Sequence, residues 1–302
     1  MKVPTPSVPS FAEQVQAWLW SAGYVSYLRV LRPSVFPTLV VQRPRAGGTL
    51  ALRLIDLPTW RAEPEDLLKA PDEGTWVQLW EDTWLTQRDI VQSRLLARLG
   101  QSTRIPARLC EIRRISQPTL DAFLKTHHLQ GTASARIKYG LFLKPRYLGR
   151  AFAKALPSAE EPVAVAGFSN ARTIWRGGRA FRSCELIRFA SLKYHTVVGG
   201  LNKCIQTFVN EWQPDDLMTY ADRDWSSGHS YRHLGFLVDS ATPPQLFWLD
   251  LLTLRRHDPQ RLVGTKLVPS TPPPGFLPVY NRGNLKFVRY FVPPPVRSDQ
   301  VL

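Results

Sequence analysis

Residues 183–250 read SCELIRFASLKYHTVVGGLNKCIQTFVNEWQPDDLMTYADRDWSSGHSYRHLGFLVDSATPPQLFWLD, and the spacing of apolar residues changes several times within this stretch. Short apolar runs indicate strands, and apolar residues at helical spacing indicate helices. The predicted strands cover 184–191, 217–221 and a segment from 236, and the predicted helices cover 201–212 and 228–234. This order predicts an α/β unit with a glycine turn, Gly199-Gly200, before its first helix.

The glycine turn is the first candidate binding site. The leading N–H groups of a helix have no partners within the helix and lie at the positive end of its dipole, so they favour a phosphate. An ordinary tight loop is the alternative interpretation. The candidate cofactor-binding residues are Val198, Gly199, Gly200, Leu201, Asn202 and Lys203, of which the last adds a positive charge.

The stretch resembles the core of the GNAT acyltransferase superfamily. The resemblance rests on the segments 197–203 (VVGGLNK) and 231–236 (YRHLGF). It implies an α/β (α+β) fold with a central mixed sheet and flanking helices. It also implies that the backbone after a central strand holds the pyrophosphate of acetyl-CoA or a related acyl-CoA.

Within that superfamily, the sequence is more similar to phage Mom-type adenine-modifying proteins and to the C-terminal domains of phage homing-endonuclease-like proteins. Asn202 stands where those proteins carry a serine. The similarity implies N-acylation of nucleic acid, with adenine in DNA as the target. It rests on the order of ELIR (185–188), YAD (220–222), Gly228 and Tyr231.

Acyl transfer to an amine needs a base for the amine and an acid for the leaving thiolate. Asp222, at the end of a predicted strand, is the candidate base, and Arg188 is the residue that would orient it. Tyr231 is the candidate acid, and His128, at a predicted helix end, is the strongest candidate among the histidines. The alternatives are structural: a cap or ion pair for Asp222, and packing for Tyr231.

The composition is strongly basic. The chain has 302 residues, with 39 Lys and Arg against 24 Asp and Glu, a net charge of +15 and a pI near 10.1. Positive charge spread along the chain favours DNA as a partner. A solvated loop over 171–182 and an ordinary buried Trp225 are the alternatives. The candidate nucleic-acid-binding residues are Arg172, Trp175, Arg176 and Arg179 in that predicted loop, and Trp225, which would stack on an extruded base.

The three cysteines, Cys110, Cys184 and Cys204, are widely spaced. This spacing argues against a disulfide framework and against a zinc site. No apolar run is long enough to span a bilayer, and no apolar leader follows Met1. We therefore expect a cytoplasmic protein with no metal site and no membrane partner, and the sequence indicates no oligomeric state.

The pattern of apolar residues over 1–104 predicts a separate small α/β domain, with helices over 11–21 and 86–99 and strands between them. The layout resembles the PD-(D/E)XK nucleases, near the very-short-patch-repair endonucleases, which hold Mg²⁺ on carboxylates. Arg53 stands about where those enzymes carry an acid. The remaining carboxylates are Asp56, Glu81 and Asp82, and we expect a degenerate domain that has lost its metal acids.

We expect three parts: a degenerate nuclease-like domain (1–104), a GNAT-like acyltransferase domain (105–257) and a Pro-rich C-terminal arm (258–302) with a hairpin over 279–291. The favoured function is N-acylation of nucleic acid from an acyl-CoA. The alternatives are a non-catalytic DNA-binding accessory protein of a mobile element or phage-derived system, and a Mg²⁺-dependent endonuclease.

Overall fold

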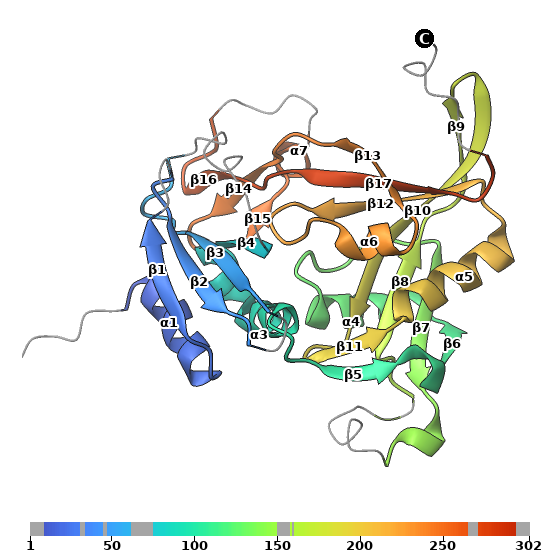
Figure 1. Cartoon of the computed structure of the whole chain (residues 1–302). Helices are drawn as coiled ribbons and strands as arrows, with labels where there is room; N and C mark the ends of the chain where they lie inside the picture. Colours follow the sequence, from blue (N-terminus) through green and yellow to red (C-terminus); the bar gives the residue numbers. More distant parts are fainter. Residues whose placement is uncertain are drawn as a thin grey trace, which may run out of the picture.

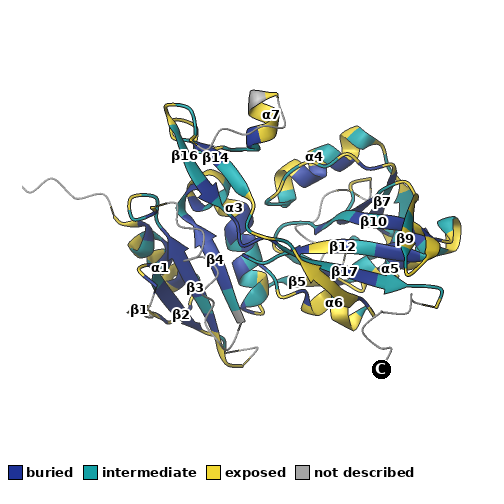
Figure 2. Cartoon of the chain, turned by 90° about the horizontal axis from the view of Figure 1, so that it is seen from above, coloured by how far each residue is buried: buried dark blue, intermediate teal, exposed yellow. Residues whose placement is uncertain are grey.

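The structure, a computed structural model, describes residues 9–30, 34–44, 47–61, 75–149, 158, 160–264 and 271–293. Two large sheets lie side by side (Figure 1). The first is four-stranded and belongs to residues 9–99, which we call the N-terminal unit. The second is eight-stranded, and we call it the main sheet. Figure 2 shows that the central strands of both sheets are largely buried, whereas exposed residues concentrate on some outer strands and on the surrounding helices and turns.

The N-terminal unit begins with helix α1 (Phe11–Ser21), as the sequence predicts. A capping box starts it: the Ser10 hydroxyl accepts from the Glu13 N–H, and the Glu13 carboxylate accepts from the Ser10 N–H. The apolar face of α1 packs on the sheet. In spatial order the strands are β1 (Ser26–Val30), β2 (Pro37–Gln42), β3 (Thr49–Ile55) and β4 (Thr75–Trp80), antiparallel except for the parallel pair β3–β4.

Helix α3 (Glu81–Arg98) follows β4 directly. It starts earlier than the predicted helix over 86–99, because Glu81 and Asp82 form its first turn. Carboxylates are favourable there, since they face the positive end of the helix dipole. Gln87 has non-helical angles (φ −133°, ψ 32°), so the helix is kinked close to the predicted start.

The main sheet is mixed. Its strand order is β13-β17-β12-β10-β8-β7-β6, with β9 paired to the first part of β10. β10 and β12 are parallel, and the other neighbours are antiparallel. The bounds are β5 (Thr103–Pro106), η1 (Ala107–Leu109), β6 (Cys110–Arg114), α4 (Gln117–His127), β7 (Ile137–Leu143), η2 (Pro145–Tyr147), β8 (Ala164–Phe168), β9 (Arg172–Arg176), β10 (Arg179–Ser191), β11 (His195–Val198), α5 (Gly200–Trp212), β12 (Asp216–Asp222), α6 (His229–His233), β13 (Leu237–Ala241), β14 (Leu246–Asp250), β15 (Arg256–His257), α7 (Pro259–Val263), β16 (Phe276–Tyr280) and β17 (Asn284–Tyr290).

Helix α5 covers one face of the main sheet. Its buried residue Phe208 stacks on Phe168 of β8, with ring centroids 4.2 Å apart and planes 4° apart. A short parallel pair, β5 with β11, lies beside the N-terminus of α5. This pair holds the turn between β11 and α5 close to η1.

Two predictions of local structure are wrong. Residues 171–182, predicted as a loop, form a hairpin in which β9 pairs with β10 around Gly177 and Gly178, both at positive φ. The hairpin predicted over 279–291 does not form, because β16 pairs with β14 and β17 lies between β12 and β13. Alternating apolar residues mark a strand but not its partner.

A three-stranded sheet of β14, β15 and β16 packs against the N-terminal unit. The Trp60 indole N–H donates to the Pro278 carbonyl at 2.8 Å. The segment expected as a separate C-terminal arm therefore supplies β16 to this sheet and β17 to the main sheet, while 265–270 and 294–302 lie outside the described residues. The shared core contains Phe36, Ile55, Trp60, Trp80, Leu249 and Val279.

The predicted α/β architecture, a central mixed sheet with flanking helices preceded by a smaller α/β unit, is confirmed. Within the part of the chain that the structure describes, no helix is both long and apolar enough to cross a membrane.

Candidate functional site

The candidate site lies where two parallel strands separate. β10 and β12 pair over Ser183–Glu185 and Asp216–Met218. Beyond these positions β10 continues against β8, and β12 continues against β17. The Thr219 hydroxyl donates to the Leu186 carbonyl at 2.9 Å where the strands part. We call this opening the fork; open α/β sheets bind ligands at the carboxyl ends of their strands.

A β-bulge lies on one side of the fork. The register of β10 against β8 shifts just before Arg188, and bulges often redirect a side chain beside a functional site. Nη1 of Arg188 donates to the preceding carbonyl at 2.9 Å, and its Nε is buried without a hydrogen-bond partner among the described residues. Burial lowers the pKa of Arg188, while Glu185, Tyr231 and Asp222 act in the opposite direction. Arg188 therefore lies within electrostatic reach of Asp222, which it was predicted to orient, and of Tyr231.

Asp222 ends β12 on the other side of the fork. Its Oδ1 accepts from the Asp224 N–H at 2.9 Å, and its Oδ2 accepts from Nε2 of Gln130 at 3.2 Å. Burial raises the pKa of Asp222, although these hydrogen bonds and the charge of Arg94 oppose the rise. A carboxylate with a raised pKa is a stronger base near neutral pH.

Tyr231 lies on α6, close to Thr219 at the start of the fork. Its ring packs on Phe236 and Phe287, with centroid distances of 5.7 and 5.5 Å. Burial raises the pKa of Tyr231, while a hydrogen bond with the Thr219 side chain and nearby arginines oppose the rise. The phenol is therefore protonated at neutral pH and has a proton to donate.

His128 follows α4 as its C-cap residue. Its Nδ1 accepts from the Gln130 N–H at 3.2 Å. Burial lowers the pKa of His128 to about 3, and the charges of Arg94 and Arg188 add to the effect. At neutral pH the imidazole is neutral, so it can accept or relay a proton but does not act as a cationic acid.

The structure thus brings together the four predicted catalytic residues from β10, β12, α6 and the end of α4. The prediction missed Arg94, which lies on α3 in the N-terminal unit. Its charge acts on Asp222, Tyr231 and His128, and its guanidinium lies 5.0 Å from the centroid of the Trp225 ring. The sequence carries no signal for this role, because an arginine on an amphipathic helix is usually solvent-exposed.

The predicted phosphate-binding turn lies at the N-terminus of α5. Gly199 is the N-cap, in the left-handed conformation (φ 79°), and no side chain caps the helix. The first N–H groups of a helix have no acceptor within it, so those of Gly200, Leu201 and Asn202 are available to a ligand. A shallow pocket of about 370 Å³ opens here. Its lining includes Val198, Gly199, Arg104 and Arg108, and both arginines are exposed.

The remaining residues of the predicted turn have distinct roles. Lys203 donates its ammonium protons to the carbonyls of Ala107 and Cys110, which ties η1 to α5 instead of leaving the charge at the helix end. Asn202 is exposed, whereas Leu201 is partly buried against the core of the main sheet. The two arginines of the pocket, which the sequence prediction did not include, supply the positive charge that was expected from Lys203.

The predicted nucleic-acid-binding residues separate into two groups. Trp175 and Arg179 lie on the β9–β10 hairpin, where Trp175 is 71% exposed and Arg172 is also exposed. Arg176 instead forms an ion pair with the fully buried Asp216. Trp225 was expected at the mouth of the pocket, but it is 5% exposed and packs in the core of the N-terminal unit. Burial of Trp225 bears out the alternative interpretation and corrects the stacking role.

The carboxylates considered for a nuclease are engaged separately. Asp56 accepts from the Thr59 N–H within a turn, and Glu81 accepts from the Leu57 N–H. Asp82, 2% exposed, accepts two hydrogen bonds from Arg256, at 2.7 and 2.9 Å. Over the described ranges, no group of three or more His, Cys, Asp or Glu side chains is placed to hold a metal ion.

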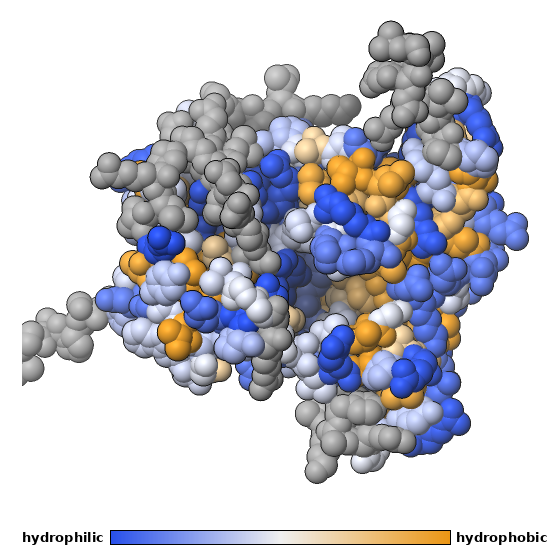
Figure 3. All heavy atoms as spheres, in the orientation of Figure 1, coloured by the Kyte–Doolittle hydropathy of each residue, from blue (hydrophilic) through white to orange (hydrophobic). Residues whose placement is uncertain are grey.

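Figure 3 shows the surface hollowed between the N-terminal unit, on the left, and the part of the main sheet that carries α6, on the right. Hydrophilic residues border this hollow. The fork and α3 both face the junction between the two sheets, because Arg94 of α3 acts on Asp222 and Tyr231.

Comparison with known proteins found no matching family model and no related sequence among curated proteins. Solved structures with some similarity include the NatC complex bound to Gag peptide and CoA (7% identity, TM-score 0.34, 61% of this chain and 99% of that chain). A Bacillus subtilis acetyltransferase in complex with CoA gives 11% identity, a TM-score of 0.34 and the same two coverages, 61% and 99%. A protein from Desulfovibrio desulfuricans described as an acetyltransferase of the GNAT family gives 8% identity, a TM-score of 0.32, and 60% and 98% coverage. TM-scores this low establish neither fold nor function, so the site is interpreted from its own geometry.

Proposed function

We propose that this protein is an acyl-CoA-dependent N-acyltransferase of the GNAT type that acts on nucleic acid. The observation that carries the proposal is the fork, where β10 and β12 part and residues from four elements converge on the opening. Arg188 and Asp222 flank it, and Tyr231 lies above its start. This arrangement agrees with the order of motifs in the GNAT resemblance.

The donor would extend from the α5 turn toward the fork. The N–H groups at the start of α5, with Arg104 and Arg108 beside them, suit a diphosphate. Among the described residues, the edge of β10 that faces away from β8 has no strand partner beyond Glu185. The Leu186 and Ile187 carbonyls accept from the side chains of Thr219 and Arg188, so we expect the amide-bearing arm of coenzyme A to use other backbone groups of this edge. Bound there, acyl-CoA would supply an activated thioester.

The residues at the fork provide the two proton transfers that the reaction needs. Asp222 would take the proton that the acceptor amine loses as the carbon–nitrogen bond forms. Tyr231 would give a proton to the thiolate released as the carbon–sulfur bond breaks. Arg188 would hold Asp222 in place, and neutral His128 can relay a proton to solvent.

A nucleic-acid acceptor is supported by charge and by the β9–β10 hairpin. The net charge is +15, and Trp175 and Arg179 are available for stacking and phosphate contact. In line with the Mom-type resemblance, we propose the exocyclic amine of adenine as the acceptor. A base in a duplex must leave the stack to reach such a site.

Calorimetric titration of acetyl-CoA tests donor binding. We expect saturable binding that weakens about tenfold or more when Arg104→Ala and Arg108→Ala are combined, since a charge-assisted contact contributes about 1.5–3 kcal/mol. Arg261→Ala is the matched control, because Arg261 is 90% exposed and does not line the pocket. Absence of heat at millimolar acetyl-CoA would contradict the proposal.

Nucleoside mass spectrometry tests the acceptor. DNA from cells that express the protein should contain an acylated adenine, and DNA from cells that express Asp222→Asn should not. A modified adenine at equal level in both samples would rule out Asp222 as the base.

A non-catalytic DNA-binding protein is the second candidate. It is favoured by the exposed side chains of the β9–β10 hairpin, which lie outside the fork. It predicts salt-sensitive DNA binding that Trp175→Ala weakens and Asp222→Asn leaves unchanged, with no modified base.

A further inference from the structure

The turn that carries Asp222 is docked on the N-terminal unit. The backbone N–H of Gln78, on β4, donates to the Asp224 carbonyl at 2.8 Å. The Gln78 side chain donates to Oδ1 of Asp224 at 3.2 Å. Trp225 completes the contact, because it packs in the core of the N-terminal unit and its N–H donates to the Asp222 carbonyl at 3.1 Å.

Helix α3 holds the same turn from a second direction. Arg94 lies over the ring of Trp225 at 5.0 Å, within the range of a cation–π contact. Since the backbone N–H of Trp225 donates a hydrogen bond to the Asp222 carbonyl, this contact links α3 to the turn that follows Asp222.

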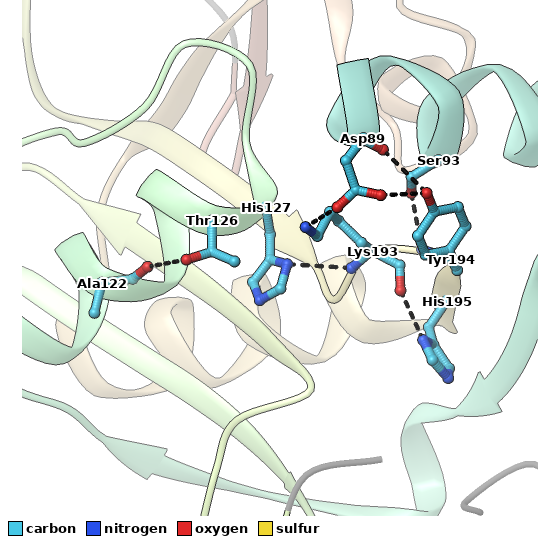
Figure 4. Close-up of polar contacts among 8 residues, drawn as sticks. All are labelled: Asp89, Ser93, Ala122, Thr126, His127, Lys193, Tyr194 and His195. Atoms are coloured by element: carbon cyan, nitrogen blue, oxygen red, sulfur yellow. Dashed lines mark hydrogen bonds and ion pairs between the residues drawn. The ribbon is translucent and has the colours of Figure 1, made fainter. Parts of the chain in front are cut away.

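Helix α3 also holds the segment between β10 and the donor turn (Figure 4). Asp89 pairs with the Lys193 ammonium and accepts from the Tyr194 hydroxyl. The Ser93 hydroxyl accepts from the Tyr194 N–H at 2.8 Å. Tyr194 has a positive φ of 63°. This conformation costs a non-glycine residue free energy, so it persists only where surrounding contacts hold it.

One helix therefore touches both halves of the fork: the chain that leads to the donor turn and the chain that carries the base. A unit that acted only as a tether would need neither contact. Instead, Gln78 of β4 contacts Asp224 in the turn after β12, and Ser93 of α3 contacts Tyr194 in the turn after β10.

We propose that the N-terminal unit is a working part of the transfer site, and that Arg94, through its contact with the Trp225 ring, is a positioning residue for the turn that carries Asp222. The proposal rests on the function proposed above only for the role of Asp222 as the base. The contact of Arg94 with Trp225, in the turn that follows Asp222, stands independently of the reaction.

Electrostatics supports this placement. The pKa of Asp222 is raised by burial, and the charge of Arg94 is the largest opposing charge. Arg256 also acts on Asp222, but it is bonded to Asp82. The charged groups that act on Asp222 are Arg94 on α3, Arg188 on β10, Asp224 in its own turn, Arg256 on β15 and Arg282 before β17.

The test is an NMR titration of the full chain labelled with ¹³C at the aspartate carboxyls. The resonances that disappear in Asp222→Asn and Asp224→Asn identify the two carboxyls. In Arg94→Gln, we expect the Asp222 titration to move to higher pH by about one unit, a tenfold change in its proton affinity. Arg94→Lys keeps the charge and should restore most of the original titration.

Arg98→Gln is the matched control. Arg98 is a half-buried arginine one helical turn further along α3, and the charges that act on it are those of Arg94 and Arg43, not Asp222. We expect the Asp222 titration to be unchanged in this variant. An unchanged Asp222 titration in Arg94→Gln, or an equal shift in Arg98→Gln, would overturn the proposal.

The outcome is separable from that of the proposed function. If acetyl-CoA does not bind the unsubstituted protein but the Asp222 titration responds to Arg94→Gln, the acyltransferase assignment fails while the positioning role stands. If acetyl-CoA binds and the titration does not respond, the positioning role fails alone.

Discussion

Three glycines with the same backbone angle allow the packing beneath α6 to be measured directly. Gly178, Gly228 and Gly283 all have φ +76°. They differ in what an added Cβ would meet. At Gly178 nothing lies within 4 Å, at Gly228 the Cβ would lie 2.0 Å from Cζ of Phe287, and at Gly283 it would lie 2.2 Å from the Thr242 carbonyl oxygen.

Substituting alanine at each position therefore separates the free-energy cost of the backbone conformation from the free-energy cost of the steric clash. The left-handed conformation costs an L-residue about 1–2 kcal/mol, and this is the whole effect expected for Gly178→Ala. Gly228→Ala adds a clash with the fully buried Phe287, and overpacking costs about 1–3 kcal/mol, so we expect a total of about 2–5 kcal/mol. Gly283→Ala should cost at least as much, because a backbone carbonyl cannot rotate away as a ring can.

The assay is urea denaturation followed by tryptophan fluorescence, with the free energy of unfolding compared among the three variants. Gly228 begins α6 and Tyr231 lies on it, so Gly228→Ala should also shift the phenol and weaken any site that uses it. Equal losses of stability in Gly178→Ala and Gly228→Ala would refute the packing of α6 on β17 described above. Such a result would remove the support for Tyr231 at the fork.

Further predictions concern stability and reactivity. Asp82→Asn should cost about 3 kcal/mol in urea denaturation, because it leaves the half-buried Arg256 without its hydrogen-bonded carboxylate, whereas Asp258→Asn at the exposed pair with Arg261 should change the free energy of unfolding by less than about 1 kcal/mol. The pKa of His128 is about 3 in the folded chain and near its ordinary value when unfolded, so the unfolded state binds more protons between these values and stability should fall as pH drops from about 6.5 toward 3. In His128→Gln this pH dependence should be weaker, and an identical slope in both proteins would contradict the burial of the imidazole. Cys110, Cys184 and Cys204 are buried, and burial raises their thiol pKa to about 11, 11 and 12, so Ellman's reagent should react only after denaturation.

Local periodicity was enough to locate most elements of this chain. The helix at Phe11–Ser21, its Ser10 cap, and the α5 helix after Gly199 follow from apolar spacing and capping residues, which act within a few positions of the chain. Boundaries were less accurate where a tertiary contact intervened, as at the kinked start of α3.

The pairing of the strands could not be predicted from local periodicity. Alternation marked β16 and β17 as strands, but their partners lie far along the chain, in β14 and in β12 and β13. The same limitation hid the hairpin of β9 and β10, whose arginines and tryptophan were read as a loop. Partner choice depends on long-range burial, which a local pattern does not contain.

The same distinction between local pattern and long-range contact applies to the candidate site. The sequence alone singled out Asp222, Tyr231, Arg188 and His128 as candidates, because each occurs at the end of a predicted element or within a motif of the resemblance. Only the tertiary structure decided that β10 and β12 separate, that Trp225 is buried, and that Arg94 of α3 lies over the Trp225 ring. The physical reason is range: spacing along the chain determines helices and strands, whereas burial and charge between distant segments determine which side chains meet.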